Sequence, residues 1–454
     1  MSFKNLLFLP KTCFSFNLKV FKNHQHLNPA FHSDVCVIGG GLTSSLISNM
    51  IPVQTPIKSL YLRLFSKNTY SAFEGFELIT NGLKDCEDLN FPVLKLFNEY
   101  FGIEFDTVLN FEPKEKKIFT LDREYTYTHL IIAEELVPNL NKIKGLKEAI
   151  ESPYNKVGTI CDIEYIEKAT NLLENYIFKK EGEVIFYDSG NFSKNFLSMI
   201  NCAFLFEAKL RKKNKSLRNN TKISFITKNK ELVPGREIFS TYLGELFKKK
   251  EIEIINSSEL IEVDIEKNKI FLNNQNKKEE IAFSILIAEP EYDIPYNLKG
   301  SPFYNPEKNL LEFNSDTLMS EQFENVYGIG GCCHDYKSKK IFLNMDSLLH
   351  ESMTVCKNIA INSYYKSEGK FSFFNNEEYT YGKLYLGSNK MIVLEIDERN
   401  EKILDLGMIG FFKEMLYYPK KFKKYIPQGK WYGMKHQYKV PDFELKRRKL
   451  DVII

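Results

Sequence analysis

Short apolar runs alternate with amphipathic segments along most of this chain. Buried strands are predicted at residues 34–38, 58–65, 127–133, 183–187, 222–226, 252–255 and 281–288. Helical spacing predicts helices over residues 42–50, 92–101, 163–178, 236–249 and 338–362. Strands that alternate with helices in this way are typical of parallel sheets covered by helices. The pattern therefore predicts an α/β protein.

Three other regions interrupt the alternation. Residues 108–132 read as short strands and turns, and residues 259–273 read as a β-meander. After residue 371 the pattern changes, with strands predicted at 379–382, 384–387 and 391–395. Residues 209–220 are rich in Lys, Asn and Arg, which favours a solvated surface loop.

A glycine turn follows the first predicted strand. Gly39 and Gly41 occupy the first two places of the G-x-G-x-x-G dinucleotide fingerprint, Leu42 begins the helix, and Ser44 stands at the third glycine place. Amides at the start of that helix would face an anion. An ordinary strand–turn–helix without a ligand is the alternative. The second strand ends at Phe65-Ser66 without the acid that usually binds the adenosine ribose.

Composition narrows the class of protein. The 454 residues carry a net charge of +3, which gives no indication of nucleic-acid binding. The eight cysteines include no C-x-x-C pair, so no metal site or thioredoxin motif is predicted. No apolar run approaches the roughly 18–20 residues that a membrane-spanning helix requires. Residues 1–33 contain lysines and no acid, which predicts a mitochondrial transit peptide; a tail without targeting function is the alternative.

Four stretches together carry a resemblance to a known family. They are DVCVIGGG (34–41), THLIIAEELVPNLNKIKGLKEA (128–149), SPFYNPEKNLLEFNSDTLMSEQFENVYGIGGCCHDYKSKK (301–340) and GSNKMIVLEID (387–397). In these the chain resembles the mitochondrial sulfide:quinone oxidoreductases, flavoproteins with two dinucleotide-binding domains. The resemblance implies FAD as cofactor, and sulfide and membrane quinone as substrates. It also implies a mitochondrial location with peripheral contact to the inner membrane.

The resemblance further implies a domain organisation. An FAD-binding Rossmann-like domain is expected from residues 34–150 and 300–365, with a second Rossmann-like domain from 151–299 inserted between them. Residues 366–454 would form a region for membrane docking or dimerisation that faces the quinone. Within it, residues 403–432 combine aromatic and apolar side chains with lysines, as an interfacial membrane anchor does. A segment packed on the core with a solvated basic face is the alternative.

Residue by residue, the resemblance weakens where the chemistry would lie. Asn195 and Gly382 stand at the two redox-cysteine positions of the family, and Cys202 lies seven residues beyond Asn195. Gly330-Gly331 replaces the family's Gly-Asp flavin motif, and Ala133-Glu134-Glu135 replaces Ala-Thr-Gly. A carboxylate near a pyrophosphate is repulsive. Cys332 and Cys333 are expected to be structural.

The residues that the resemblance assigns to FAD are therefore few. They are Gly39, Gly41, Leu42, Ser44, Gly330, Gly331 and Lys339. An exposed lysine at a helix start is the alternative for Lys339. No catalytic residue is predicted. Two functional hypotheses remain open: a sulfide:quinone oxidoreductase that still binds FAD, and a catalytically inactive member that acts as a scaffold or interaction protein.

Overall fold

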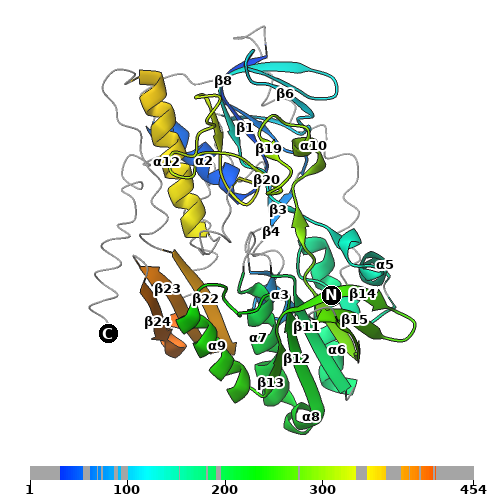
Figure 1. Ribbon diagram of the computed structural model, residues 1–454. Coiled ribbons are helices and arrows are strands. Elements are labelled where there is room, and N and C mark those ends of the chain that lie inside the picture. The colour runs from blue at the N-terminus through cyan, green and yellow to red at the C-terminus, as the bar shows by residue number, and fades with distance from the viewer. Residues whose placement is uncertain are drawn as a thin grey trace.

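The computed structural model places two sheet-centred lobes one above the other (Figure 1). The structure describes residues 31–54, 62–68, 70–72, 75–85, 90–93, 101–152, 154–179, 182–190, 196–274, 277–333, 345–364, 380–387, 389–397, 400–412 and 415. Within this part of the chain, no helix has the length and apolar character needed to cross a membrane. The α/β class predicted from the hydrophobic pattern is confirmed.

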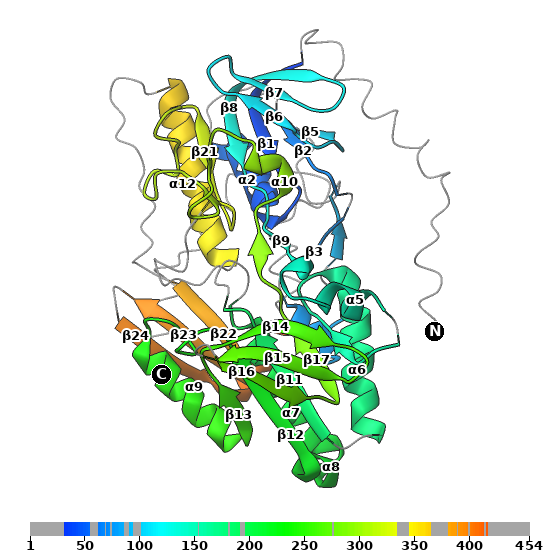
Figure 2. The same cartoon turned by 45° about the vertical axis from the view of Figure 1, so that its right-hand side comes forward.

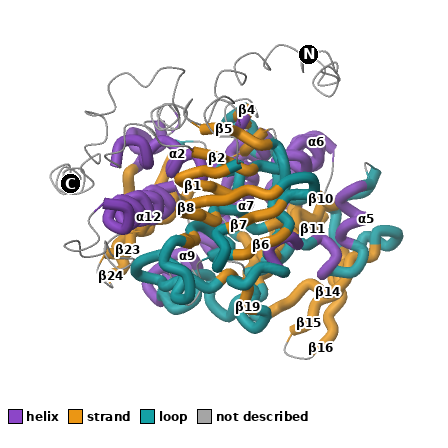
Figure 3. The backbone as a smooth tube through the Cα atoms, turned by 90° about the horizontal axis from the view of Figure 1, so that it is seen from above, coloured by secondary structure: helices purple, strands orange, loops and turns teal. Residues whose placement is uncertain are grey.

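The first sheet has seven strands and collects them from distant parts of the chain. Its order is β5 (Phe101–Glu104), β2 (Leu62–Phe65), β1 (His32–Ile38), β8 (Glu124–Ile132), β7 (Lys117–Phe119) and β6 (Asn110–Glu112), and β21 (Val326–Gly328) also pairs with β8 (Figure 3). The strands β5, β2, β1, β8 and β21 are parallel to one another. The strand β7 pairs with β8 in the antiparallel sense, and β6 pairs with β7 in the same way. The register aligns Ile38 with Phe65 and with Ile132. The strands β1, β2 and β8 therefore end at the same level, so the segments that follow them start from one side of the sheet.

Two long helices pack together beside this sheet (Figures 1 and 2). They are α2 (Leu42–Gln54) and α12 (Met345–Tyr364). Residues 42–50 of α2 are all buried, and its apolar side chains join the central core. Small pairings lie around the sheet: β3 (Tyr70–Ala72) with β4 (Asn90–Pro92), β9 (Val137–Pro138) with β18 (Tyr292–Asp293), and β19 (Tyr304–Asn305) with β20 (Leu310–Leu311).

The second sheet has five parallel strands. Its order is β10 (Val157–Gly158), β17 (Ile285–Ala288), β11 (Gly182–Asp188), β12 (Thr221–Thr227) and β13 (Ile252–Ile255). The accompanying helices are α5 (Leu146–Glu151), α6 (Ile163–Lys179), α7 (Ser198–Lys213), α8 (Lys215–Asn220) and α9 (Glu237–Lys249). The β-meander is confirmed as β14 (Ser258–Asp264), β15 (Lys269–Asn274) and β16 (Lys277–Ala282). Short elements complete this part: α3 (Phe76–Thr80), a 3-10 turn over Leu140–Lys142, and α10 (Tyr296–Lys299).

The C-terminal sheet is antiparallel and packs against α7. It consists of β22 (Thr380–Gly387), β23 (Lys390–Asp397) and β24 (Asn400–Leu406). The edge strand β22 is held by one amide side chain: Asn201 Nδ2 donates to the Lys383 carbonyl at 2.9 Å, and the Tyr385 amide donates to Asn201 Oδ1 at 2.8 Å. Residues 407–412 then turn into a helix, in which Phe411 is buried against Tyr385.

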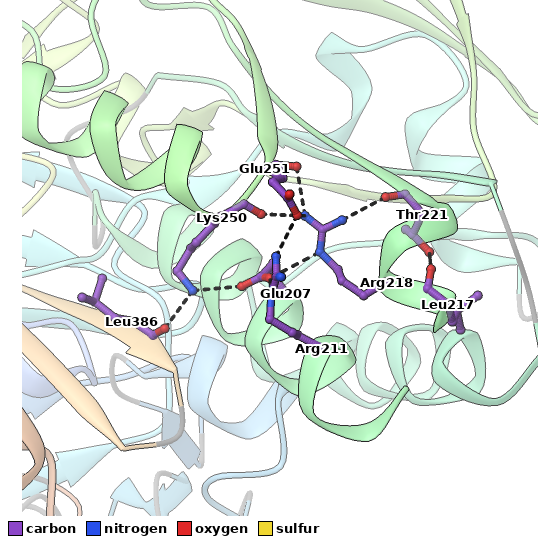
Figure 4. A network of polar contacts seen from close by, with 8 residues as sticks. All are labelled: Glu207, Arg211, Leu217, Arg218, Thr221, Lys250, Glu251 and Leu386. Atoms are coloured by element: carbon purple, nitrogen blue, oxygen red, sulfur yellow. Dashed lines mark hydrogen bonds and ion pairs between the residues drawn. The ribbon is translucent and has the colours of Figure 1, made fainter. Parts of the chain in front are cut away.

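The predicted loop at 209–220 is wrong, because these residues are helical. The end of α7 and all of α8 cover this stretch, and the Asn214 side chain accepts the Leu217 amide to begin α8. Arg211 and Arg218 of this stretch pair with Glu207, which is only 2% exposed, and Lys209 and Lys213 pair with Glu174. Arg211 Nε, Lys250 Nζ and Arg218 Nε donate to Glu207 at 2.6, 3.0 and 3.3 Å (Figure 4). Arg218 is 3% exposed and also donates to three backbone carbonyls.

Three further predictions need correction or a limit. The helix at 92–101 is wrong at both ends, since Pro92 lies in β4 and Phe101 in β5, and residues 94–100 lie outside the described residues. The two strands at 379–382 and 384–387 are one strand, β22. The anchor predicted over 403–432 begins within β24, and most of it lies outside the described residues.

Candidate functional site

The candidate site lies where β1 leaves the first sheet. Gly39 has φ +123°, and its amide donates to the Phe65 carbonyl at 2.9 Å. A Cβ on Gly39 would lie 2.4 Å from the Ala133 carbonyl oxygen, so only glycine fits. The chain then enters α2 at Leu42, which is buried. The strand, tight turn and helix predicted from the sequence are therefore present.

Glu135 fills the space beside Gly41. A Cβ on Gly41 would lie 2.1 Å from Glu135 Oε1 and 2.8 Å from its Cδ. In the dinucleotide fingerprint this glycine lets the pyrophosphate approach the backbone closely. Here a carboxylate from the segment after β8 reaches that place.

Glu134 adds a second carboxyl group at the same edge. Its side chain is buried, and burial raises its pKa; exposed Lys67 opposes this effect and Glu135 strengthens it. Two unit charges 4 Å apart interact by about 4 kcal/mol at an effective dielectric constant of 20. An anionic phosphate beside Glu135 would meet repulsion of that order.

The end of β2 offers no carboxylate for a ribose. Ser66 stands there, and its hydroxyl donates to the Asn68 carbonyl at 2.8 Å while accepting the Asn68 amide at 3.2 Å. A Cβ on Gly40 would lie 2.0 Å from this hydroxyl oxygen. The nearest strand-end acid is Glu104 on β5, aligned with Phe65, and its carboxylate lies 3.6 Å from Arg63.

The second glycine turn is also closed by an acid of the chain. Gly330 has φ +83°, and its amide donates to Glu351 Oε2 at 2.8 Å. Glu351 lies on α12 and is fully buried. Gly331 is buried next to this turn. Sequence reasoning missed Glu351, although an acid within the apolar face of a predicted helix was the available signal.

Ser44 lies in the first turn of α2, fully buried, and its hydroxyl has no hydrogen-bond partner among the described residues. Lys339 and Asn195 lie outside the described residues. Gly382 is buried in the middle of β22, paired with Leu394. The structure therefore brings Gly39, Gly41, Leu42, Ser44 and Gly330 to one region around α2, and Gly382 lies in the C-terminal sheet.

Six cysteines fall within the described residues, and all six are free and buried. Burial raises the pKa of Cys202, assisted by nearby Glu77, and Asn81 donates to its sulfur at 3.7 Å. Burial likewise raises the pKa of Cys332 and Cys333 well above the usual value, so both thiols are protonated at neutral pH. The thiolate is the reactive form of cysteine. These thiols are therefore poor nucleophiles.

The second sheet also carries a buried acid at a strand end. Asp188 closes β11 and is 3% exposed. It accepts the Gly190 amide at 2.9 Å and the Thr227 hydroxyl at 3.1 Å. Burial raises the pKa of Asp188 to about 6, although these two hydrogen bonds oppose the rise.

The residues around α2 do not fit a bound FAD in this arrangement. The backbone turn at Gly39 has the required shape, but Glu135 takes the space beside Gly41, Ser66 replaces the ribose acid, and Glu351 occupies the Gly330 amide. Each of these groups stands where the resemblance places a contact to the cofactor. The mismatch is thus in the binding groups, while the fold around them is intact.

Comparison with known proteins places the chain in a family. No family model matches the sequence. The mitochondrial sulfide:quinone oxidoreductase of Schizosaccharomyces pombe is 23% identical over 88% of this chain and 92% of its own length. The mouse protein of the same name is 28% identical over 52% of this chain. These relatives support a divergent member of the sulfide:quinone oxidoreductase family. The chain spans about half the length of the mouse relative, 51%.

Solved structures share the fold of this chain. The enzyme from Aquifex aeolicus has a TM-score of 0.75 at 16% identity, covering 94% of this chain and 96% of its own. A chain in the mitochondrial ATP synthase of Tetrahymena thermophila has a TM-score of 0.74 at 16% identity and is covered over 96% of its length. NDH2 from Plasmodium falciparum, solved with NADH, has a TM-score of 0.58 at 14% identity.

Proposed function

We propose that this protein is a catalytically inactive member of the sulfide:quinone oxidoreductase family that serves as a scaffold in mitochondria. The observation that carries the proposal is the state of the thiols. By the resemblance, Gly382 stands at one redox-cysteine position, and all six described cysteines are buried. Sulfide oxidation in the family requires a pair of reactive cysteines beside the flavin. The thiol of Cys202 is buried and its pKa is raised, so it is a poor substitute for a reactive redox cysteine.

Two further observations support a scaffold. The apolar cores of both lobes are fully formed, so the chain has kept its fold while its binding groups changed. A chain within the Tetrahymena mitochondrial ATP synthase has the same fold. The fold is therefore compatible with a place inside a large mitochondrial assembly. The lysine-rich segment 1–33 and the mitochondrial relatives support that location for this chain.

A direct assay tests the proposal. The full-length protein would be mixed anaerobically with sulfide and a water-soluble ubiquinone analogue, and quinone reduction followed by absorbance. We expect no saturable, sulfide-dependent reduction. Turnover that saturates with sulfide would overturn the proposal, and its loss in Cys202→Ser or in Cys332→Ser would identify the thiol used. Native electrophoresis of mitochondria should show the protein migrating well above the mass of a monomer.

The second candidate is an FAD-dependent sulfide:quinone oxidoreductase. The observation that favours it is the turn at Gly39, which retains the backbone shape of a dinucleotide site. FAD would supply electron transfer between sulfide and quinone when bound. With the Glu135 and Glu351 side chains displaced from this arrangement, the residues to hold it would be Gly39, Gly41, Leu42, Ser44, Gly330, Gly331 and Lys339. Stoichiometric flavin in the purified protein, together with turnover, would favour this candidate.

A face of the C-terminal region suits contact with a membrane or a partner. Met408, Ile409 and Phe412 are 55%, 72% and 51% exposed on the turn of helix after β24, while Phe411 between them is buried. Exposed apolar side chains beside lysines favour insertion into a membrane interface. Met408→Ser with Ile409→Ser should weaken cosedimentation with anionic vesicles. Unchanged cosedimentation would contradict this role.

A further inference from the structure

We propose that Glu135 is an internal anion that takes the place of a cofactor pyrophosphate at the start of α2, so that the chain closes its own dinucleotide site. The proposed scaffold function concerns lost redox chemistry and would also allow a bound flavin. This inference goes beyond it, because it states what occupies the site.

The geometry at Gly41 carries the first step. The fingerprint requires glycine there so that a phosphate can lie against the backbone. In this structure the end of the Glu135 side chain lies there, with Oε1, Cδ and Cγ 2.1, 2.8 and 3.2 Å from the place of a Gly41 Cβ. A ligand phosphate and this carboxylate cannot share the space.

The electrostatics of α2 carry the second step. A helix N-terminus carries a partial positive charge and attracts anions. The first turn of α2 has no acidic residue of its own, although the helix has 13 residues and its first nine are buried. Glu135 supplies the missing negative charge from the segment after β8. The carboxylate therefore lies beside the helix end that a pyrophosphate would approach in a nucleotide-binding relative.

At the second glycine turn, a carboxylate of the chain, that of Glu351, again stands near the place of a cofactor contact. Its buried carboxylate accepts the Gly330 amide, which adjoins the place of the family's flavin-binding aspartate. Two glycine turns at one edge of the sheet are thus each met by a carboxylate of the chain. The coincidence favours replacement of the ligand over a chance side-chain position.

The test compares full-length wild type with Glu135→Ala, which removes the charge and empties the space beside Gly41. Glu135→Gln serves as a second variant that removes the charge and keeps the side-chain volume, so it separates repulsion from steric exclusion. Glu148→Gln is the matched control, because it removes an exposed acid from the first turn of another helix, α5. FAD and inorganic pyrophosphate are the probes. Binding of each is detected by its effect on thermal unfolding, and binding of FAD also by equilibrium dialysis.

We expect the wild type to purify without flavin and its Tm to stay unchanged in excess FAD. Glu135→Ala should have a lower Tm without ligand, and FAD should raise it, with binding at least about tenfold tighter than in wild type. Glu135→Gln should bind FAD more weakly than Glu135→Ala, because its side chain still fills the space. Glu148→Gln should behave as wild type. Stoichiometric FAD in the wild-type protein would overturn the inference and, in the absence of turnover, leave the scaffold proposal standing. Identical FAD binding by Glu135→Ala and Glu148→Gln would also overturn it.

Discussion

Glu207 offers the sharpest test of the packing in the second lobe, because three cations converge on one buried carboxylate. Glu207→Gln removes the charge and keeps the shape. Arg218 would remain almost fully buried and lose its adjacent carboxylate, keeping a neutral amide oxygen, backbone carbonyls and the more distant Glu251 carboxylate as partners. Arg211 and Lys250 would face it without a shared anion. The substitution therefore leaves buried positive charge uncompensated.

The expected loss of stability follows from the free energies measured for buried ion pairs. Removing one partner of a buried ion pair costs about 3–5 kcal/mol. For a domain of this size, each kcal/mol lowers Tm by about 2–4 °C. At the lower value of about 3 kcal/mol, Glu207→Gln should therefore lower the Tm of the second lobe by roughly 6–12 °C.

The measurement is thermal unfolding of the full-length protein, with Glu251→Gln as the control. Glu251 contacts the same arginines but is 66% exposed, so its loss should cost less than about 1 kcal/mol. Equal effects of the two substitutions would refute the reasoning, because exposure would then not govern the energy.

A pH series gives a second readout. Burial alone would raise the pKa of Glu207, but Lys250 and Arg211 hold it below the usual value. The stabilisation is therefore present above the unfolded-state pKa and is lost as pH falls through the folded-state pKa. Wild type and Glu207→Gln should differ at pH 7 and converge in acid. A difference that does not shrink as pH falls below the unfolded-state pKa would contradict an ionic origin.

Three other substitutions test separate contacts. The pKa of Asp188 is about 6 when folded, above its unfolded value, so the folded state binds more protons between about pH 4 and 6 and loses stability as pH rises; Asp188→Asn should flatten this part of a urea-denaturation pH series. Lys168 Nζ donates to three carbonyls at the end of α5, at 2.6–2.9 Å, and to Asn155; Lys168→Met should cost about 1–3 kcal/mol, and exposed Lys147→Met much less, by the same unfolding assay. Asn201→Ala should cost about 2 kcal/mol and speed hydrogen exchange of the Tyr385 amide; unchanged exchange would contradict the clamp.

The strand–turn–helix at Gly39 could be predicted because its signals are local. A continuous apolar run, Val35 to Ile38, defines β1, and glycines define the turn. The solvated surface predicted at 209–220 holds for Lys212, Lys213 and Lys215, which are exposed, but the loop prediction failed. Arg211 and Arg218 pair instead with Glu207, and Arg218 also with carbonyls of other elements. Partners distant in sequence leave no periodic signal. Tertiary pairing therefore overrode the local preference of this stretch.

The candidate site, too, was partly predictable from local sequence and partly dependent on tertiary contacts. Sequence alone placed two carboxylates near the expected cofactor path, from the position of Glu134 and Glu135 after β8. Which of them reaches Gly41 depends on the side-chain direction at the end of a strand, and only the structure gives it. Glu351 could not be connected to Gly330 without knowing how α12 packs on the turn.

The clamp formed by Asn201 has a consequence for assembly. An exposed sheet edge invites pairing with a strand of another chain. Asn201 occupies an outward carbonyl and an outward amide of β22, and Lys250 Nζ takes the Leu386 carbonyl at the adjacent irregularity in register. This border of the C-terminal sheet is closed to a neighbouring strand. Any association of two chains by sheet extension in this region would have to proceed from the opposite border, β24.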